Sequence, residues 1–287
     1  MIKSSKMELK NKKIGLITKP HEDVKKYLEE AVSAIEEFGA TCILEDIAAD
    51  MLGRKEKVKR EDVSGLCDLV ILIGGDGTFL SVAESAVKAQ VPIAGFNLGT
   101  LGFLTELKKD KIYSSVQSLV KGEFRISERK LLEVSFKNET SLSLNDVVFS
   151  KGDIARIIKL RLEIDQVEVS EIRADGLIVS TPTGSTAYSL SAGGPILAPE
   201  VNGVVITPIC PHSLTFRPFV VPDSSEIKVT LSSDSDNVVI TLDGQKVIPM
   251  SINDVVSVKT YEMKLKMVIS DELNYFRLLS EKLKWGI

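Results

Sequence analysis

The chain has little of several residue types on which common active sites depend. It contains two histidines and three cysteines, Cys42, Cys67 and Cys210, and no two cysteines form a Cys-x-x-Cys pair. These numbers exclude a histidine-rich metal site, argue against a Ser-His-Asp triad, and predict neither a zinc site nor a disulfide framework. Because scattered, unpaired cysteines are typical of a reducing compartment, we expect a cytoplasmic protein.

Long apolar runs and a strong excess of one charge are also missing. No apolar segment approaches the roughly 18 residues of a membrane-spanning helix. The lysine-rich start, residues 1–13, lacks the apolar core of a signal peptide. The formal net charge is only −4. We therefore expect no membrane partner and no nucleic-acid partner.

What the sequence does contain is enough apolar material for two domains or one large one. The chain has 287 residues, of which 44% are hydrophobic. In the first hundred residues, apolar segments predict strands at 13–18, 41–44, 69–73 and 93–97, and an amphipathic helix covers 24–38. This alternation predicts a parallel sheet covered by helices, with the ligand site at the carboxyl ends of the strands.

From about residue 125 the pattern changes to short segments in which polar and apolar residues alternate. The clearest segments are 131–136, 159–164, 226–231 and 264–269. Alternation with period two predicts antiparallel strands with one solvated face, as in a β-sandwich or a related β-domain.

The predicted fold is therefore an N-terminal Rossmann-like α/β domain followed by a β-sandwich-like domain. We place the α/β domain at residues 1–122 and the β-rich domain at residues 123–270. The remaining residues, 271–287, contain a segment with helical spacing, 274–285, which we expect to pack back on the first domain.

The most informative stretch lies where the predicted strand 69–73 ends in Gly74-Gly75-Asp76-Gly77-Thr78 and a helical pattern begins. Glycines let backbone N–H groups approach a phosphate closely, and a helix N-terminus favours an anion. A carboxylate repels phosphate, so Asp76 makes more sense as a general base or as a ligand to a phosphate-bound Mg²⁺. The alternative is a tight turn in which Asp76 only caps the helix.

A second glycine- and hydroxyl-rich block, residues 173–195, lies within the β-region. After a predicted strand at 177–180 comes Thr181-Pro182-Thr183-Gly184-Ser185-Thr186-Ala187-Tyr188. Small residues permit close approach of a ligand, hydroxyls supply hydrogen-bond partners, and Tyr188 offers a stacking face. The same composition suits an exposed loop, but Arg173 and Asp175 favour a polar ligand with a phosphate and ribose hydroxyls or an amide.

Several shorter motifs have a structural interpretation beside the functional one. Asn145-Asp146 and Asp243-Gly244-Gln245 are typical of turns, the second of a hairpin turn. The basic run 54–60 is typical of a surface loop. Asn97 either caps a backbone group or binds a ligand, and the sequence does not separate the two.

Taken together, these blocks resemble the NAD kinase family, in the order of that family and over most of the chain. The blocks are Gly74-Gly75-Asp76-Gly77-Thr78, Asn97-Leu98-Gly99-Thr100-Leu101-Gly102-Phe103, Asn145-Asp146, Asp175-Gly176, residues 181–188, Pro211-His212-Ser213 to Pro222, and Asp243-Gly244-Gln245. The first turn also resembles those of diacylglycerol-type lipid kinases and phosphofructokinases, whereas the 181–188 block with its ordered companions is specific. One departure is Asp146, where bacterial members often have Glu.

The resemblance implies transfer of a phosphoryl group from ATP or polyphosphate to the 2′-hydroxyl of the adenosine ribose of NAD. It implies Asp76 as the general base, Mg²⁺ or another divalent cation, and a homodimer or homotetramer. The residues implied to hold the phosphate donor are Gly74, Gly75, Gly77 and Thr78. The residues implied to bind NAD are Asp76, Gly77, Asn145, Asp146, Arg156, Arg173, Asp175, Thr186, Ala187, Tyr188, Ser189, Leu190, Ser191 and Gln245.

Two other functions stay open at this point. A lipid or sugar kinase would share the Asp76 turn but leaves residues 173–188 without a use. A non-catalytic NAD(P) sensor would share the second block but has no need of Asp76.

Overall fold

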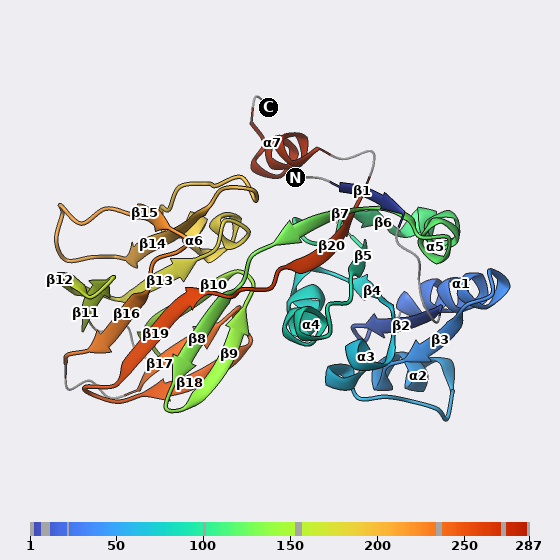
Figure 1. Cartoon of the computed structure of the whole chain (residues 1–287), viewed down its shortest axis with the longest axis horizontal. Helices are drawn as coiled ribbons and strands as arrows, with labels where there is room; N and C mark the ends of the chain where they lie inside the picture. Colours follow the sequence, from blue (N-terminus) through green and yellow to red (C-terminus); the bar gives the residue numbers. More distant parts are fainter. Residues whose placement is uncertain are drawn as a thin grey trace. The chain divides into compact units, whose positions relative to one another are not determined.

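The computed structural model describes residues 3–6, 12–21, 23–99, 102–152, 157–233, 237–270 and 274–285 (Figure 1). The chain divides into two compact units: unit 1 comprises residues 1–128 and 265–287, and unit 2 comprises residues 129–264. Unit 1 is an α/β unit and unit 2 is mostly β, which confirms the predicted fold class. The domain boundaries after residues 122 and 270 stay a prediction; the compact units change six residues away from each.

Among its described residues, unit 1 contains an eight-stranded sheet. Its order is β1 (Lys3–Lys6), β7 (Glu123–Arg129), β20 (Leu265–Ile269), β5 (Ile93–Asn97), β4 (Leu69–Gly74), β2 (Lys13–Thr18) and β3 (Thr41–Leu44), and β6 (Leu107–Lys108) also pairs with β5. The strands around β4 run parallel, as the alternation of strands and helices predicts. The carboxyl ends of β4 and β5 are therefore neighbours, at Gly74 and Asn97.

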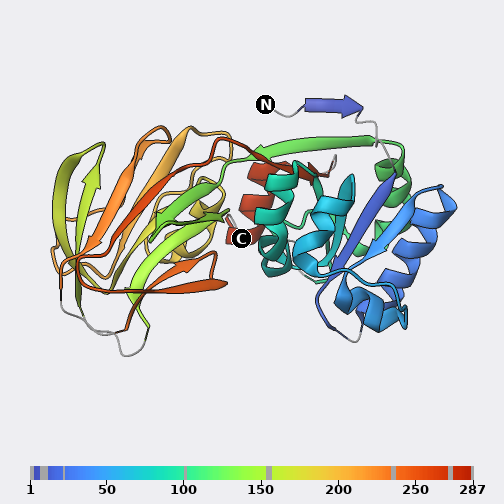
Figure 2. The same ribbon diagram turned by 60° about the horizontal axis from the view of Figure 1, so that its bottom comes forward.

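Helices cover both faces of this sheet (Figure 2). They are α1 (Val24–Glu37), α2 (Asp46–Leu52), α3 (Arg60–Leu66), α4 (Asp76–Ala89) and α5 (Ile112–Val120); unit 1 also contains the short helix η1 (Lys109–Lys111) and α7 (Tyr275–Leu283). Leu69, Ile71 and Ile73 of β4 share one apolar cluster with α1 and α5. Because successive side chains of a strand point to opposite faces, Val70 and Leu72 face the other layer, where α4 contacts β4. All five side chains are fully buried, so β4 anchors the centre of the unit.

The C-terminal segment differs from one expectation and agrees with another. The alternation at 264–269 predicts an antiparallel strand of the β-region, and this is wrong: β20 pairs with β5 in parallel, Met267 opposite Ile93. Alternation of polar and apolar residues with period two indicates a strand, but it carries no information about which sheet the strand joins. The helix that follows, α7, belongs to unit 1 as predicted, and buries Leu278 and Leu279.

The basic run 54–60 is a surface loop only in part. Residues 54–57 are exposed, as expected. Arg60, however, begins α3 and pairs with Glu45, which is 1% exposed. The same guanidinium donates to the carbonyl of Thr18 at 2.6 Å and to the Ser81 hydroxyl at 3.0 Å. Arg60 therefore ties β2, the start of α2 and α4 together instead of lying in solvent.

Unit 2 contains two six-stranded antiparallel sheets within its described residues. One has the order β15 (Phe219–Pro222), β14 (Gly203–Ile209), β13 (Gly176–Ser180), β10 (Asp146–Lys151), β17 (Val238–Leu242) and β18 (Lys246–Met250). The other has the order β12 (Val167–Ala174), β11 (Ile158–Ile164), β16 (Ile227–Leu231), β19 (Val255–Thr260), β8 (Leu132–Phe136) and β9 (Glu139–Ser143). One apolar cluster takes residues from both sheets, so the two pack as a sandwich.

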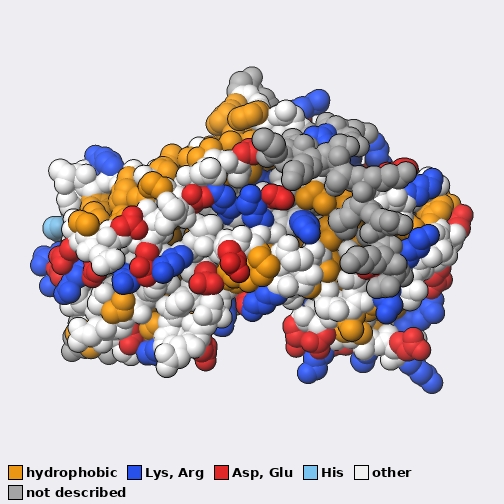
Figure 3. All heavy atoms as spheres, in the orientation of Figure 1, with side chains coloured by type: hydrophobic (Ala, Val, Ile, Leu, Met, Phe, Trp, Pro, Cys, Tyr) orange, Lys and Arg blue, Asp and Glu red, His pale blue; other side chains and the backbone are white. Residues whose placement is uncertain are grey.

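The surface is mixed in charge, in keeping with the low net charge. On the face drawn in Figure 3, lysine and arginine side chains are interspersed with aspartate and glutamate. Within the residues that the structure describes, no helix combines the length and apolar character needed to cross a membrane.

Candidate active site

Asp76 lies at the carboxyl end of β4, where the strand gives way to α4. Gly75 is the residue that precedes the helix, and Asp76 is its first residue. The alternative in which Asp76 caps the helix is wrong, because no side chain caps α4 and the Asp76 carboxylate bonds elsewhere. A carboxylate in the first helical turn is favoured by the helix dipole.

The two oxygens of the Asp76 carboxylate are used unequally. Oδ1 accepts three hydrogen bonds: from the backbone N–H groups of Leu104 and Thr105, each at 3.1 Å, and from the Thr105 hydroxyl at 3.0 Å. Oδ2 accepts one, from the backbone N–H of Phe103 at 3.0 Å. A carboxylate has about four lone-pair sites, two on each oxygen. Oδ1 is therefore saturated, whereas Oδ2 can accept another hydrogen bond.

The four residues predicted to hold the phosphate donor, which flank Asp76 in the sequence, differ in how much open space lies beside their backbone. A Cβ at Gly75 or Gly77 would meet no heavy atom within 4 Å, so both are open to close approach. Gly74 and Thr78 instead pack on each other: a Cβ at Gly74 would lie 2.6 Å from the Thr78 Oγ1. Thr78 is 6% exposed. The open part of the turn is thus Gly75 to Gly77.

In unit 2, Asn145 and Asp146 lie on a turn that one carboxylate holds in place. Asp243 accepts from the backbone N–H groups of Leu144 at 2.8 Å, Asn145 at 2.7 Å and Asp146 at 3.2 Å. The Ser143 hydroxyl donates to the same carboxylate at 2.6 Å. Because four donors converge on Asp243, the backbone of this turn has one well-defined conformation.

The 181–191 block packs against the same turn. The carbonyl oxygen of Asn145 accepts from the backbone N–H of Thr181 at 2.9 Å, and the Thr181 hydroxyl donates to the carbonyl of Leu144 at 2.6 Å. The short helices η2 (Gly184–Thr186) and α6 (Tyr188–Ser191) follow. Ser189 is fully buried and shares a hydrogen bond with Thr207, whereas the side chain of Tyr188 is 47% exposed.

A cavity of about 380 Å³ in unit 2 joins these pieces. Four of the residues predicted to bind NAD line it: Asn145, Asp146, Ala187 and Tyr188. Asp243 and Gly244 line it as well. Two blocks that are some 40 residues apart in sequence, and a third from the β17–β18 turn, therefore form one concave surface with polar groups and an exposed aromatic ring.

Other predicted residues lie outside this cavity. Arg173 is exposed near the end of β12, and Asp175 follows directly between β12 and β13. Gln245 is exposed in the turn before β18. The remaining residues of the set in unit 2 that do not line the cavity are Thr186, Ser189, Leu190 and Ser191. Arg156 lies outside the described residues.

The electrostatics of the cavity are set by two neighbouring carboxyl groups. The pKa of Asp146 is raised to about 7, first by burial and second by the negative charge of Asp243, while a hydrogen bond from the backbone N–H of Tyr188 acts in the opposite direction. Burial also raises the pKa of Asp243, against the four donors that it accepts from. Near neutral pH Asp146 is therefore present in part as the neutral acid, which can donate a hydrogen bond.

This raised pKa predicts that the Asp146→Asn variant is more stable than the wild type at high pH. The folded chain holds the Asp146 proton up to about pH 7 and the unfolded chain only to about pH 4, so wild-type stability falls as pH rises through this window. Asparagine has no proton to lose. We expect its melting temperature to exceed that of the wild type by several degrees at pH 8 and by little at pH 4.

Scanning calorimetry at both pH values measures this difference. Glu139→Gln, at an exposed carboxyl in the same unit, is the control, and should show no such dependence on pH. An equal shift for Asp146→Asn at both pH values would contradict the buried, proton-holding state of Asp146.

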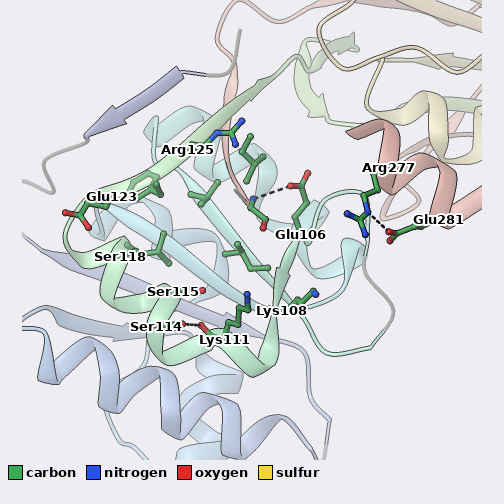
Figure 4. Close-up of a pocket in the computed structure, with 16 residues that line it drawn as sticks. Glu106, Lys108, Lys111, Ser114, Ser115, Ser118, Glu123, Arg125, Arg277 and Glu281 are labelled. Carbon is green, nitrogen blue, oxygen red and sulfur yellow. Dashed lines mark hydrogen bonds and ion pairs between the residues drawn. The ribbon is translucent and has the colours of Figure 1, made fainter. Parts of the chain in front are cut away.

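A second cavity, of about 480 Å³, lies within unit 1 and contains none of the predicted site residues (Figure 4). Its charged residues have both signs. The Nε of Arg277 donates to Glu281 at 3.1 Å, and Glu106 accepts from the backbone N–H of Ser270 at 3.4 Å. Lys108 and Glu123 also line it. This mixture favours neither an anionic nor a cationic ligand.

Sequence reasoning missed two parts of this arrangement. The backbone N–H groups of residues 103–105 donate to Asp76. The sequence shows the glycine-rich motif that ends at Phe103, but gives no sign that this segment contacts Asp76. Asp243 is in a hairpin turn, as predicted, but its carboxylate reaches residues about 100 positions earlier in the chain. Local patterns report neither contact, because both depend on how distant segments meet.

Comparisons with known proteins cover both units. The model of the ATP-NAD kinase N-terminal domain matches residues 6–124, and that of the ATP-NAD kinase C-terminal domain matches residues 144–270. The NAD kinase of Geobacter sulfurreducens is 41% identical over 281 residues, which cover 96% of this chain and 99% of that protein. The NAD kinase of Geotalea daltonii is 42% identical with the same coverage.

Solved structures agree with the sequence comparisons. Yeast NADH kinase complexed with NADH has a TM-score of 0.87 and 27% identity, over 96% of this chain and 88% of that one. The NAD kinase from Archaeoglobus fulgidus in complex with ATP has a TM-score of 0.76 and 25% identity, over 95% of this chain and 98% of that one. With both family domains matched and relatives about 40% identical over nearly the whole length, the chain belongs to the NAD kinase family.

Proposed function

We propose that this member of the NAD kinase family transfers a phosphoryl group from ATP to the 2′-hydroxyl of the adenosine ribose of NAD, with Asp76 as the general base. The family assignment supports the reaction, which converts NAD to NADP. The observation that carries the role of Asp76 is the unequal use of its oxygens. From the residues that the structure describes, Oδ1 accepts three hydrogen bonds and Oδ2 only one, so Oδ2 has a lone pair for a substrate proton.

In the proposed step one oxygen–phosphorus bond forms and another breaks. The ribose 2′-oxygen bonds to the terminal phosphorus of ATP, the bond from that phosphorus to the bridging oxygen breaks, and ADP leaves. The hydroxyl proton passes to Oδ2 of Asp76 and from there to water. Because a ribose hydroxyl is a weak nucleophile, a positioned carboxylate lowers the barrier. Most of the remaining catalysis in phosphoryl transfer comes from positioning and charge neutralisation.

In this proposal the glycines beside Asp76 position the phosphates of ATP. Gly75 and Gly77 allow phosphate oxygens to approach the backbone at the start of α4, whose N-terminus favours anions. The family uses ATP, so a divalent cation accompanies the donor, and we propose Mg²⁺. Within the described residues no three His, Cys, Asp or Glu side chains gather as a metal cage. A cation held by phosphates and water needs only one or two protein carboxylates, and Asp76 fits that requirement.

The cavity of unit 2 supplies the acceptor side. We propose that Asn145 and Asp146 bind hydroxyls of the NAD ribose and that the exposed ring of Tyr188 stacks on a base. A neutral Asp146 could donate a hydrogen bond where an ionised one only accepts. The other residues of the predicted NAD set, Arg156 included, stay proposals.

We also propose that the protein is a homo-oligomer and that it is located in the cytoplasm. A homodimer or homotetramer is expected from the family resemblance, and the mass of the protein in solution tests it. The three free cysteines suit a reducing compartment such as the cytoplasm.

A panel of donors and acceptors tests the reaction. The purified chain is incubated with ATP or polyphosphate, with NAD or NADH, and with or without Mg²⁺, and the products are identified by mass spectrometry. We expect NADP from NAD, ATP and Mg²⁺, and none when the cation is chelated. Tight NAD or NADP binding without turnover would instead indicate a sensor. Phosphorylation of diacylglycerol or a sugar without NADP formation would indicate the other kinase classes.

A further inference from the structure

Two buried residues that the proposed reaction does not use directly, Asn97 and Thr105, form a chain of hydrogen bonds that ends at Asp76. The Asn97 Nδ2 donates to the Thr105 hydroxyl at 2.8 Å, and the Thr105 hydroxyl donates to Asp76 Oδ1 at 3.0 Å. Asn97 is 8% exposed and Thr105 is fully buried. Asn97 is the last residue of β5 and pairs with Gly74, the last residue of β4, so the ends of the two strands lie side by side.

The direction of these bonds follows from the donors and acceptors available. The backbone N–H of Gly99 donates to Asn97 Oδ1 at 2.7 Å, which fixes the orientation of the amide. The NH₂ group of Asn97 must then face Thr105 and can only donate. A hydroxyl has one hydrogen, so Thr105 accepts from Asn97 and donates its hydrogen to Asp76. The amide of Asn97 thus sets the direction in which the Thr105 hydroxyl points.

Two glycines leave the space that this contact requires. A Cβ at Gly102 would lie 2.0 Å from Asp76 Oδ1 and 2.6 Å from Thr105 Oγ1. A Cβ at Gly95 would lie 3.0 Å from Thr105 Cγ2 and 3.2 Å from Thr105 Cα. Gly102 therefore leaves the room for Thr105 to contact Asp76, and Gly95 lets the Thr105 backbone pack closely on β5. The hydrogen bond between Thr105 and Asp76 is therefore a consequence of the close backbone packing in unit 1.

We propose that Asn97 and Thr105 are positioning residues that bind one oxygen of Asp76, so that the other oxygen faces the acceptor hydroxyl. This inference rests on the proposed role of Asp76 as the base. The Thr105 hydroxyl is a third donor on Oδ1, beside the backbone N–H groups of Leu104 and Thr105, and it restrains rotation of the carboxylate. From the described residues Oδ2 accepts only the backbone N–H of Phe103, so it has a lone pair for a substrate proton. Neither residue has to touch a substrate for this effect.

Two substitutions at Thr105 separate the hydroxyl from the methyl group. Thr105→Val keeps the shape but removes the hydroxyl, and Thr105→Ser keeps the hydroxyl but removes the methyl group. Steady-state kinetics with NAD and MgATP should show kcat lowered by about 10- to 100-fold in Thr105→Val, the usual effect of a lost hydrogen bond to a charged group. The KM for NAD should change by less than about threefold, and Thr105→Ser should stay within about threefold of the wild type in both constants.

Asn97→Asp is a second, independent test. An aspartate oxygen in place of Nδ2 accepts the Thr105 hydrogen and turns it away from Asp76. We expect this variant to lower kcat as Thr105→Val does, with a KM for NAD close to the wild-type value. Unfolding curves for all three variants exclude a loss of folded protein as the cause.

A double-mutant cycle distinguishes failure of this inference from failure of the proposed function. The wild type must first form NADP, which tests the function alone. In the Asp76→Asn background, Thr105→Val should then have almost no further effect on kcat, because its role is exercised through the carboxylate. An equal loss of kcat in both backgrounds, equal losses for Thr105→Val and Thr105→Ser, or wild-type kcat in Thr105→Val would each overturn the inference and leave the proposed function standing.

Discussion

Replacing Asp76 by asparagine is expected to lower kcat by about 10²- to 10⁴-fold, the range of a lost general base. Asparagine has nearly the same shape, and its oxygen can take the place of Oδ1, where three donors converge. Its NH₂ group then replaces Oδ2 and cannot accept a proton. The fold of the 102–105 segment should survive, with the loss of one hydrogen bond from Phe103.

The same variant should bind NAD nearly as well as the wild type. Titration calorimetry measures the dissociation constant, and we expect it within about threefold of the wild-type value, since the base acts mainly in the transition state. Asp46→Asn is a matched control, because Asp46 is also the first residue of a helix in unit 1, α2. The control should keep wild-type kcat. A kcat of the Asp76→Asn variant near that of the control would show that another group takes the proton.

The fold follows from the sequence wherever the information is local. Five consecutive apolar residues before Gly74 predict a strand buried on both faces, and β4 is fully buried at each of them. Period-two alternation predicts the sandwich strands, and Asp243-Gly244 predicts the hairpin that joins β17 and β18. There both residues have positive φ, 52° and 65°, the conformation that short hairpin turns require.

What the sequence does not reveal are the contacts between distant segments. Nothing in the alternation at 264–269 indicates that β20 joins the parallel sheet of unit 1 beside β5. Nothing near Asp243 indicates that its carboxylate binds three backbone N–H groups at residues 144–146. Both are decided by tertiary packing, because a strand can pair with any exposed edge and a turn carboxylate can bind any donor that lies in reach.

The candidate site shows the same division. Asp76 stands out because a carboxylate among glycines conflicts with a simple phosphate loop, and this conflict is visible in the sequence. Thr105 gives no such signal, since a lone threonine after Leu104 is ordinary. Its contact with Asp76 depends on Gly102, where any side chain would clash with both residues, and on Gly95, which lets the Thr105 backbone pack on β5. Asp76 was thus recognisable from the sequence as a candidate, whereas Thr105, which donates to it, was not.

Gly184 lies at a close backbone contact between two of the segments that form the unit 2 cavity. A Cβ at this position would lie 2.1 Å from the carbonyl oxygen of Asn145, 2.4 Å from its carbonyl carbon and 2.6 Å from its Cα. All three atoms belong to backbone, so no side-chain rotation can relieve the contact. The Asn145 carbonyl in turn accepts from the backbone N–H of Thr181 at 2.9 Å, and Asp243 accepts from the backbone N–H groups of Asn145 and Asp146.

Gly184→Ala is therefore expected to displace the Asn145-Asp146 turn from the 181–188 block. We expect the free energy of unfolding to fall by about 3 kcal/mol, the upper part of the usual range for overpacking. The dissociation constant for NAD should rise at least about tenfold, because a misplacement near 1 Å disrupts a positioned site. Denaturant unfolding measures the first quantity and titration calorimetry the second.

Gly65→Ala is the matched control for this substitution. Gly65 lies in α3, where a Cβ would meet no heavy atom within 4 Å, and alanine in a helix is more stable than glycine by about 0.5–1 kcal/mol. The control should be at least as stable as the wild type and should bind NAD equally well. If Gly184→Ala instead kept both wild-type stability and NAD affinity, the expected displacement of the Asn145 turn would be wrong. A fall in stability with unchanged affinity would mean that this turn supports the fold of unit 2 without contacting the dinucleotide.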